Sequence, residues 1–535
     1  MVGGGARRDY ARRMHRAPRP GPITSVTDRR SVLGLGLALG LLAACTGDDL
    51  GSPDDAGRCE PAPPALPVAG PLIDPLAAVL PCVPGGLRDL PGRWFIAADG
   101  PGFSYEYPRF EGSCEAGFRR ALRGDDLDDS DGTSFHTWSD GTRIFLRSYS
   151  RFPRADLPPF EFGNALTACL RADGTLIADR ALFDTDRGER HIALTGERFA
   201  PKDGAPVGLR LLGELGTQGG KPLPAYNVVV DGAYAYTAGP LGLDVIDVSS
   251  PGAPVHVGHA DGAFNDVRVV RGAGKIVAYA APLEGEETAV IDVTDPARPV
   301  MAPPIPEYSH SLQVQTVGAA THLYLATYTN VVPRYDVTNP LVPVRLGEAR
   351  VPGPEAGVHD LFVDGDRIYA NNTREGLVAF DVSGGLGAAV ELGRRKSPYS
   401  HASWAGTAGG RRIVLHGDEG MTNIGGAFLS VLDGDPASPT FLTELGRYQT
   451  RKQVGIHNFQ LVGDKVYISY YQDGVRVVDL SVPAMPREVA HYNTWREESA
   501  YGGTFEGAIG IRVGGDGRIY VADLARGLLI LEERP

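Results

Sequence analysis

Residues 358–382 read VHDLFVDGDRIYANNTREGLVAFDV, and residues 456–480 read IHNFQLVGDKVYISYYQDGVRVVDL. Both stretches contain an apolar run, a Gly-containing turn, a second apolar run, a glycine, and a third run that ends in Asp. Short apolar runs bounded by turn residues are typical of β-strands. A fourth run follows in neighbouring units, as in residues 343–347 (PVRLG). The pattern therefore predicts a repeating unit of four strands.

This unit recurs between residues 206 and 535, where we count seven copies. Four strands per unit, with a period of about 40–55 residues, are typical of a β-propeller blade. The third strand ends in an acidic residue in every copy: Asp247, Asp292, Asp336, Asp381, Asp433, Asp479 and Glu532. We interpret this carboxylate as a structural cap for the following turn. The sequence predicts an all-β chain with a seven-bladed propeller at 206–535.

The two ends of the repeat region predict how the ring closes. The last unit stops after its third strand, at residues 527–532, and lacks a fourth. A segment with the form of a fourth strand, residues 206–215 (PVGLRLLGEL), precedes the first unit. We expect these two segments to pair, because pairing leaves no open sheet edge between the first and last units.

The repeats resemble those of LVIVD-repeat proteins of bacterial cell surfaces. The residues that carry the resemblance are 243–248 (LDVIDV), 289–293 (AVIDV) and 475–480 (VRVVDL). The resemblance implies a β-propeller over 206–535. It implies no catalytic residues, and it does not extend to the preceding domain.

The N-terminus has the features of an export signal. Residues 32–44 form an apolar run that is too short to span a bilayer but suits a signal peptide over 1–44. Residues 42–45 (LAAC) resemble a bacterial lipobox, which implies lipid modification of Cys45, with palmitate among the acyl chains, and anchoring in the cell envelope. Thr46 follows, which favours the outer membrane or cell surface. Arg29 and Arg30 also resemble a twin-arginine motif, so the general and the twin-arginine export routes both stay open.

Residues 45–89 are rich in Pro and Ala and are interpreted as a tether. Residues 90–200 show alternating apolar runs and hairpin turns, which predict a small β-sandwich or barrel. The remaining four cysteines predict two disulfides of unknown pairing in an exported domain: Cys59, Cys82, Cys114 and Cys169.

Charge argues against nucleic acid as a partner. The formal net charge is −13, although the first 44 residues carry eight arginines, so the body is strongly acidic. Affinity for nucleic acid depends on neutralising phosphates with basic side chains. We expect a monomer whose partners are the membrane, through its lipid anchor, and envelope proteins or surface ligands.

Four consecutive units place histidine at the start of the first strand: His310, His359, His401 and His457. First strands surround the axis of a propeller, so these rings are expected to meet at the mouth of the central channel. Clustered imidazoles suit Zn²⁺ or Cu²⁺. Further candidate ligands nearby are Asn265, Asp266, Asp360, Asn458 and Glu506. The alternative is structural: each histidine hydrogen-bonds the backbone of a neighbouring blade.

Three functions follow from these observations, the third being a structural partner in an envelope complex. The first is a binding module at the cell surface, favoured because the repeat resemblance carries no catalytic motif. The second is a metal-dependent enzyme that uses the four histidines and a transition metal. Residues 412–428, which include Glu419, are interpreted as an insertion that overhangs one face.

Overall fold

The computed structural model describes residues 80–90, 92–98, 105–106, 109–111, 119–120, 133–139, 142–154, 157–186, 188–283, 285–353, 357–373, 375–397, 399–420, 427–497 and 505–534. The predicted signal peptide, Cys45, Cys59 and Cys114 lie outside these residues, as does the tether up to residue 79. The described elements are almost entirely β-strands. The chain is therefore all-β, as predicted.

Seven four-stranded antiparallel sheets follow one another along the chain. Sheets 1 to 3 comprise β13 (Asn227–Asp231), β14 (Tyr234–Gly239), β15 (Gly242–Asp247), β16 (Val255–Asp261); β17 (Phe264–Gly272), β18 (Lys275–Pro282), β19 (Thr288–Asp292), β20 (Val300–Ile305); and β21 (Ser311–Val317), β22 (Ala320–Ala326), β23 (Val331–Asp336), β24 (Val344–Arg350). Sheets 4 and 5 comprise β25 (Asp360–Asp364), β26 (Arg367–Asn372), β27 (Gly376–Asp381), β28 (Val390–Arg395); and β29 (Ser400–Ala408), β30 (Arg411–Asp418), β31 (Leu429–Asp433), β32 (Glu444–Tyr448). Sheets 6 and 7 comprise β33 (Phe459–Val462), β34 (Lys465–Ser469), β35 (Val475–Asp479), β36 (Arg487–Tyr492); and β37 (Ala508–Val513), β38 (Ile519–Asp523), β39 (Gly527–Glu533), with β10 (Leu209–Leu215).

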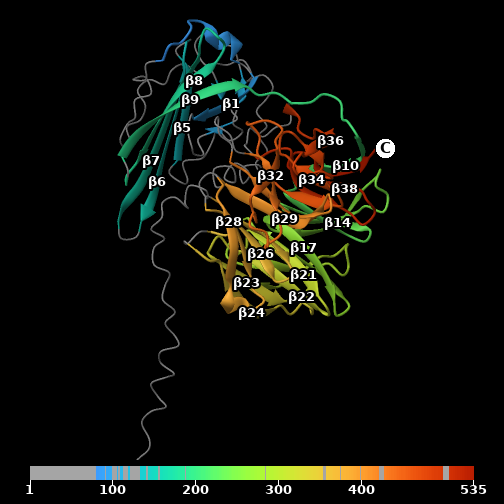
Figure 1. Cartoon of the computed structure of the whole chain (residues 1–535). Helices are drawn as coiled ribbons and strands as arrows, with labels where there is room; N and C mark the ends of the chain where they lie inside the picture. Colours follow the sequence, from blue (N-terminus) through green and yellow to red (C-terminus); the bar gives the residue numbers. More distant parts are fainter. Residues whose placement is uncertain are drawn as a thin grey trace, which may run out of the picture. The chain divides into compact units, whose positions relative to one another are not determined.

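Sheet 7 joins the two ends of the repeat region. Its outer strand is β10, which pairs antiparallel with β39, so that Arg210 lies opposite Glu532. These are the two segments that the sequence analysis expected to pair. Figure 1 shows β10, drawn in green, among the red C-terminal strands β36 and β38.

The first strands of the seven sheets contact one another in a closed cycle. The order is β13, β17, β21, β25, β29, β33, β37 and back to β13. An apolar cluster fills the junction between sheets 7 and 1, where Tyr520 and Ile530 pack with Val228 and Ile246. Sheets packed around an axis with their first strands innermost form a β-propeller.

The strand-ending Asp residues cap the turns that follow them, as the sequence analysis predicted. The carboxylate of Asp247 accepts a hydrogen bond from the backbone amide of Ser249 at 2.9 Å, and Asp381 accepts one from Ser383 at 2.8 Å. Asp292, Asp336, Asp433 and Asp479 do the same two residues on. Backbone and side-chain hydrogen bonds lower the pKa of Asp479 and of Asp247.

A nine-stranded antiparallel sheet precedes the repeats. Its strands are β1 (Gly92–Ala98), β2 (Tyr105–Glu106), β3 (Arg109–Glu111), β4 (Arg119–Arg120), β5 (Thr133–Ser139), β6 (Ile144–Arg154), β7 (Leu157–Leu170), β8 (Leu176–Asp184) and β9 (Gly188–Arg198). A disulfide joins Cys82 to Cys169, so one of the expected pairings is now defined. The end strands β4 and β5 contact each other, so the sheet curls back on itself.

The remaining described elements are short. They are the 3-10 helices η4 (Gly86–Asp89) and η6 (Leu386–Ala388) and the hairpin of β11 (Thr217–Gln218) and β12 (Lys221–Pro222). The described residues include no helix with the length and apolar character needed to cross a membrane.

Candidate functional site

In sheets 2, 5 and 7 the predicted histidine position lies at an irregularity of the first strand, whereas His310 and His359 directly precede β21 and β25. In β29 the pairing register shifts between Ser400 and Ala402, so His401 is the extra residue of a β-bulge. The same shift leaves Asn265 unpaired in β17 and Ile509 unpaired in β37. A bulge re-aims the side chain of its extra residue. The bulge therefore explains how a side chain at this position can point away from the packed interface between neighbouring sheets.

The four predicted histidines lie side by side, and we call them the axial histidine row. The ring centroids of His310 and His359 are 4.3 Å apart. Those of His359 and His401 are 4.6 Å apart, and those of His401 and His457 are 4.4 Å apart. The rings come from sheets 3, 4, 5 and 6, so four consecutive sheets contribute one ring each.

The axial histidine row lines a small cavity at the centre of the seven sheets. Its volume is about 60 Å³, which is room for a few water molecules or an ion and much less than a typical site for an organic ligand. Asn265, Asp266, Asp360 and Asn458 also line it, with Arg268 and Arg512 among the further lining residues. The cavity can therefore hold a small polar guest.

Burial keeps the row uncharged. It lowers the pKa of His310 to about 3 and that of His457 to about 4. For His359 and His401, burial and then the neighbouring histidines hold the pKa well below its ordinary value. Neutral imidazoles have a free lone pair, which is the form that binds metal ions.

One histidine makes the hydrogen bond that the structural alternative predicted. Nδ1 of His457 lies 2.7 Å from the carbonyl oxygen of Ile509, at the equivalent position of sheet 7. The side-chain amide of Asn265 makes the corresponding bond to the carbonyl of His310 at 2.9 Å. The backbone of His401 and of His457 likewise faces the rings of His359 and His401 and acts to raise their pKa, although among the described residues no hydrogen bond of ordinary geometry reaches Nδ1 of either ring. Buried polar atoms of this kind are costly unless something binds them.

A carboxyl group that the sequence analysis did not propose as a metal ligand lies beside the row. Glu419 is buried, and one of its oxygens lies 3.6 Å from Nε2 of His401. Its other oxygen accepts a hydrogen bond from the Tyr471 hydroxyl. Burial raises the pKa of Glu419 to about 8, and Asp418 adds to this. Ligand atoms of His359, His401 and Glu419 lie within 4.8 Å of one another, which suits a shared metal ion.

The reading of residues 412–428 as an insertion was wrong in part. Residues up to 418 form β30, the second strand of sheet 5, because their apolar side chains pack into the junctions. Glu419 lies two residues beyond Gly417, the partner of Ala402. In sheet 6 the residue that corresponds to Gly417 is Ser469, which pairs with Asn458, the residue after His457. Tyr471 lies two residues beyond Ser469 and therefore corresponds to Glu419. Alignment on the second strand, in addition to the first, would have found Glu419.

The backbone beside the row is strained at three equivalent positions. Tyr328, Thr373 and Tyr471 have φ values of 55°, 41° and 39°. Side chains rarely adopt this left-handed region, and such residues concentrate at functional sites. Tyr328 lies against His310, with ring centroids 4.7 Å apart, and Tyr471 lies 5.0 Å from His457. At two of these three positions, therefore, an aromatic ring lies against a histidine of the row.

Four of the five additional predicted ligands line the cavity, and one does not. Asp266 accepts hydrogen bonds from Asn227, from Arg268 and from the backbone of Leu312. Asp360 accepts one from Ser311 at 2.6 Å, and burial raises its pKa to about 6. Glu506 is not among the cavity residues: it accepts a hydrogen bond from the indole of Trp495.

Two basic residues of the cavity were not anticipated. Arg268 pairs with Asp266 at 2.5 Å. Burial lowers the pKa of Arg512 to about 10, although Asp266 and Asp360 oppose this. Arg268 lies three residues after Asn265, and Arg512 lies three residues after Ile509. Asn265 and Ile509 stand at the histidine position of sheets 2 and 7, so the alignment that identified the histidines could also have found the two arginines.

Comparisons with known proteins bear on the repeats and the fold. The LVIVD repeat family matches residues 224–261 and 457–494. No curated protein sequence matches the chain. Similar solved structures include the WD40 β-propeller domain of Doa1, at 11% identity, a TM-score of 0.42, and coverage of 61% of this chain and 98% of that one. They also include Saccharomyces cerevisiae Sqt1, at 9% identity, TM-score 0.41 and coverage of 72% and 95%. BamB from Moraxella catarrhalis matches at 12% identity, TM-score 0.37 and coverage of 72% and 96%.

Proposed function

We propose that this chain is a binding module of the cell envelope: a seven-bladed propeller behind a small disulfide-containing β domain, held at the outer membrane or cell surface by a lipid on Cys45. The seven sheets are its blades. The LVIVD repeats and the ring of sheets support the binding role, because propellers offer broad surfaces for partners. The N-terminal sequence supports the location.

One surface feature carries the proposal. The residue opposite the strand-ending Asp is an exposed valine in sheets 1 to 4: Val255, Val300, Val344 and Val390. Their exposed fractions are 56%, 60%, 54% and 62%. We call these four residues the apolar rim. Since the four sheets are consecutive in the ring, the valines follow one another along its edge.

The other three sheets are polar at the same position. The equivalents are Thr443 in sheet 5, Arg487 in sheet 6 and Arg210 in sheet 7. The repeat therefore does not require an apolar side chain there. Met301, Val342 and Leu346 add exposed apolar surface to sheets 2 and 3. We take this run of exposed apolar residues on consecutive sheets as the interaction site, because large exposed apolar patches mark such sites.

The partner that fits this surface is another protein of the envelope with an apolar patch of its own. The axial cavity, at about 60 Å³, is too small to take a protein side chain and its surroundings. Binding through the apolar rim leaves the cavity free.

Affinity capture from solubilised envelope fractions tests this function. We expect the wild-type protein to retain a discrete partner, and a Val300→Asp/Val344→Asp variant to lose it. The matched control is Val462→Asp/Val482→Asp, which changes two valines of similar exposure, 41% and 53%, outside the apolar rim. Equal capture by both variants, or no partner on the wild type, would contradict the proposal.

A second candidate function is metal-dependent chemistry at the axial histidine row. The close approach of ligand atoms of His359, His401 and Glu419 favours it. A transition metal held by these three residues would have a coordination position left for water, which it could polarise. Metal analysis of the purified protein tests it: the wild type should hold one transition-metal ion more than His359→Ala/His457→Ala. Equal metal content in the two proteins, with equal uptake of added Zn²⁺ and Cu²⁺, would exclude this function.

A further inference from the structure

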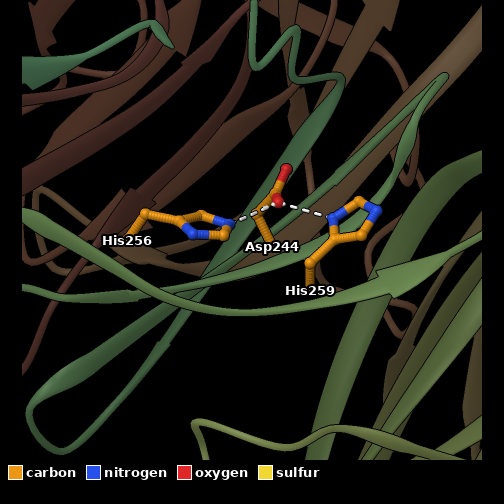
Figure 2. Close-up of side chains that lie close together, drawn as sticks. All are labelled: Asp244, His256 and His259. Carbon is orange, nitrogen blue, oxygen red and sulfur yellow. Dashed lines mark hydrogen bonds and ion pairs between the residues drawn. The ribbon is translucent and has the colours of Figure 1, made fainter. Parts of the chain in front are cut away.

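A second group of metal-ligating side chains lies in sheet 1, away from the cavity. Asp244 of β15 stands between two imidazoles of β16, as Figure 2 shows. Nε2 of His256 lies 2.8 Å from Oδ1 of Asp244, and Nδ1 of His259 lies 2.7 Å from the same oxygen. The three side chains thus converge on one point.

A β-bulge makes this convergence possible. Residues three apart in a regular strand point to opposite faces. Here the register shifts after Val245, so that Asp244 pairs with His259 and Ile246 pairs with His256. The extra residue, Val257, reverses the alternation, and both histidines come to the face that carries Asp244. The spacing of His256 and His259 alone would not have indicated this.

In sheets 3 to 6 the same two positions hold an acid and a base, whereas in sheet 7, which has the same bulge, they are Leu211 and Glu214. The pairs are Arg345 with Glu348, Arg394 with Glu391, Arg447 with Glu444, and His491 with Glu488. Each pair forms an ion pair along its own strand. Sheet 1 has histidine at both positions, which cannot pair with each other in this way. The opposite residue is also particular, since Asp244 corresponds to Pro333, Val378, Ser430 and Arg476.

The surroundings of His259 suit a metal ligand. Its other ring nitrogen, Nε2, lies 3.4 Å from a carboxylate oxygen of Asp261. Histidines that bind metals usually donate their second N–H to a carboxylate of this kind. Gly242 makes room for the ring, because a Cβ atom there would lie 2.6 Å from Cε1 of His259.

We propose that Asp244, His256 and His259 bind a divalent transition metal ion of the class that prefers imidazole, such as Zn²⁺, Co²⁺ or Ni²⁺. The ligands are Nε2 of His256, Nδ1 of His259 and an oxygen of Asp244, which all lie within 4.8 Å of one another. On binding, the ion replaces the two protons directed at Asp244. Each ring carries its proton on the other nitrogen, which for His259 is the one that faces Asp261.

The site is open on one side. The Asp244 side chain is 6% exposed and that of His256 14%, but that of His259 is 34% exposed. Three protein ligands and an open side leave coordination positions for water or for a ligand from outside. The site is independent of the axial histidine row, with which it shares no residue.

Cobalt titration of the full chain, followed by the visible absorption of bound Co²⁺, tests the proposal. We expect saturable binding that His256→Ala and His259→Ala each weaken by about 100-fold, and Asp261→Asn by about 10-fold. His491→Ala is the matched control, because it removes the histidine that corresponds to His259 but is paired with Glu488; it should leave binding unchanged. His359→Ala/His457→Ala should also leave this binding unchanged, which separates the site from the proposed axial metal.

A measurement on the wild-type protein guards against variants that fail to fold. Paramagnetic Ni²⁺ should broaden the imidazole NMR signals of His256 and His259 before those of His191, which is exposed and far along the sequence. The proposal is overturned if His256 and His259 are unaffected, or if the folded alanine variants bind Co²⁺ as the wild type does.

Discussion

Nε2 of His401 lies 3.6 Å from a carboxylate oxygen of Glu419. Near neutral pH this contact joins two uncharged groups, because burial lowers the pKa of His401 and raises that of Glu419 to about 8. Burial thus sets the protonation of both partners. A bound metal ion would lower the pKa of Glu419 again, because a positive ion stabilises the ionised carboxylate.

The pKa of Glu419 predicts a loss of stability as the pH rises from about 4.5 to about 8. The unfolded chain releases this proton near pH 4.5, whereas the folded chain keeps it up to about pH 8. The folded state binds more protons across that window, so stability falls as the pH rises through it, by up to about 1 kcal/mol per pH unit. Glu419→Gln should lose less stability between pH 5 and pH 8 in urea unfolding.

The control for this experiment is Glu286→Gln, which changes an exposed glutamate. It should follow the wild-type pH dependence. If Glu419→Gln also follows the wild type, the carboxyl group is not protonated in the folded protein.

The axial histidine row predicts a loss of stability in acid. The unfolded chain protonates histidine near pH 6.5, but His310 and His457 stay neutral in the folded state until about pH 3 and pH 4. The unfolded state therefore binds more protons below pH 6.5, and stability falls by about 1 kcal/mol per histidine for each pH unit between 6 and 4. His310→Asn removes one such group and should flatten the acid limb; an unchanged slope would show that His310 is accessible to protons.

The repeats could be predicted from the sequence because each strand carries its own apolar pattern and turn residues. Alignment of the repeat units, such as residues 358–382, identified the histidine position. The incomplete last unit indicated that residues 206–215 pair with residues 527–532. Side-chain direction could not be predicted, because it depends on bulges at His401 and Val257 that leave no mark in the apolar pattern. Glu419 was missed for a related reason: its place depends on where β30 ends.

Closure of the ring predicts a strong effect at Leu209. This residue of β10 is 2% exposed and packs with side chains of sheets 6 and 7. Leu209→Ala should cost about 2–4 kcal/mol and lower the melting temperature by several degrees. Leu346→Ala, at a leucine that is 44% exposed, should change stability by less than about 0.5 kcal/mol. Equal melting temperatures for the two variants would mean that β10 does not close the ring.

The disulfide predicts a separate effect on the N-terminal sheet. Cys82 and Cys169 are 87 residues apart, and a crosslink over a loop of this length stabilises by about 2–5 kcal/mol. Cys82→Ser should lower the stability of the N-terminal sheet, as measured by hydrogen exchange of β7 and β8. Exchange in β26 and β34 should not change. Loss of protection throughout the chain would instead show that the repeats depend on this sheet.

The binding role is tested most directly in cells that produce the anchored protein, by photo-crosslinking from single positions. A photoreactive residue at Val300 or Val344 should yield one discrete crosslinked product with an envelope protein. The same residue at Val482, an equally exposed valine outside the apolar rim, should yield none. Products that are absent from Val300 and Val344, or that are the same from all three positions, would contradict the account.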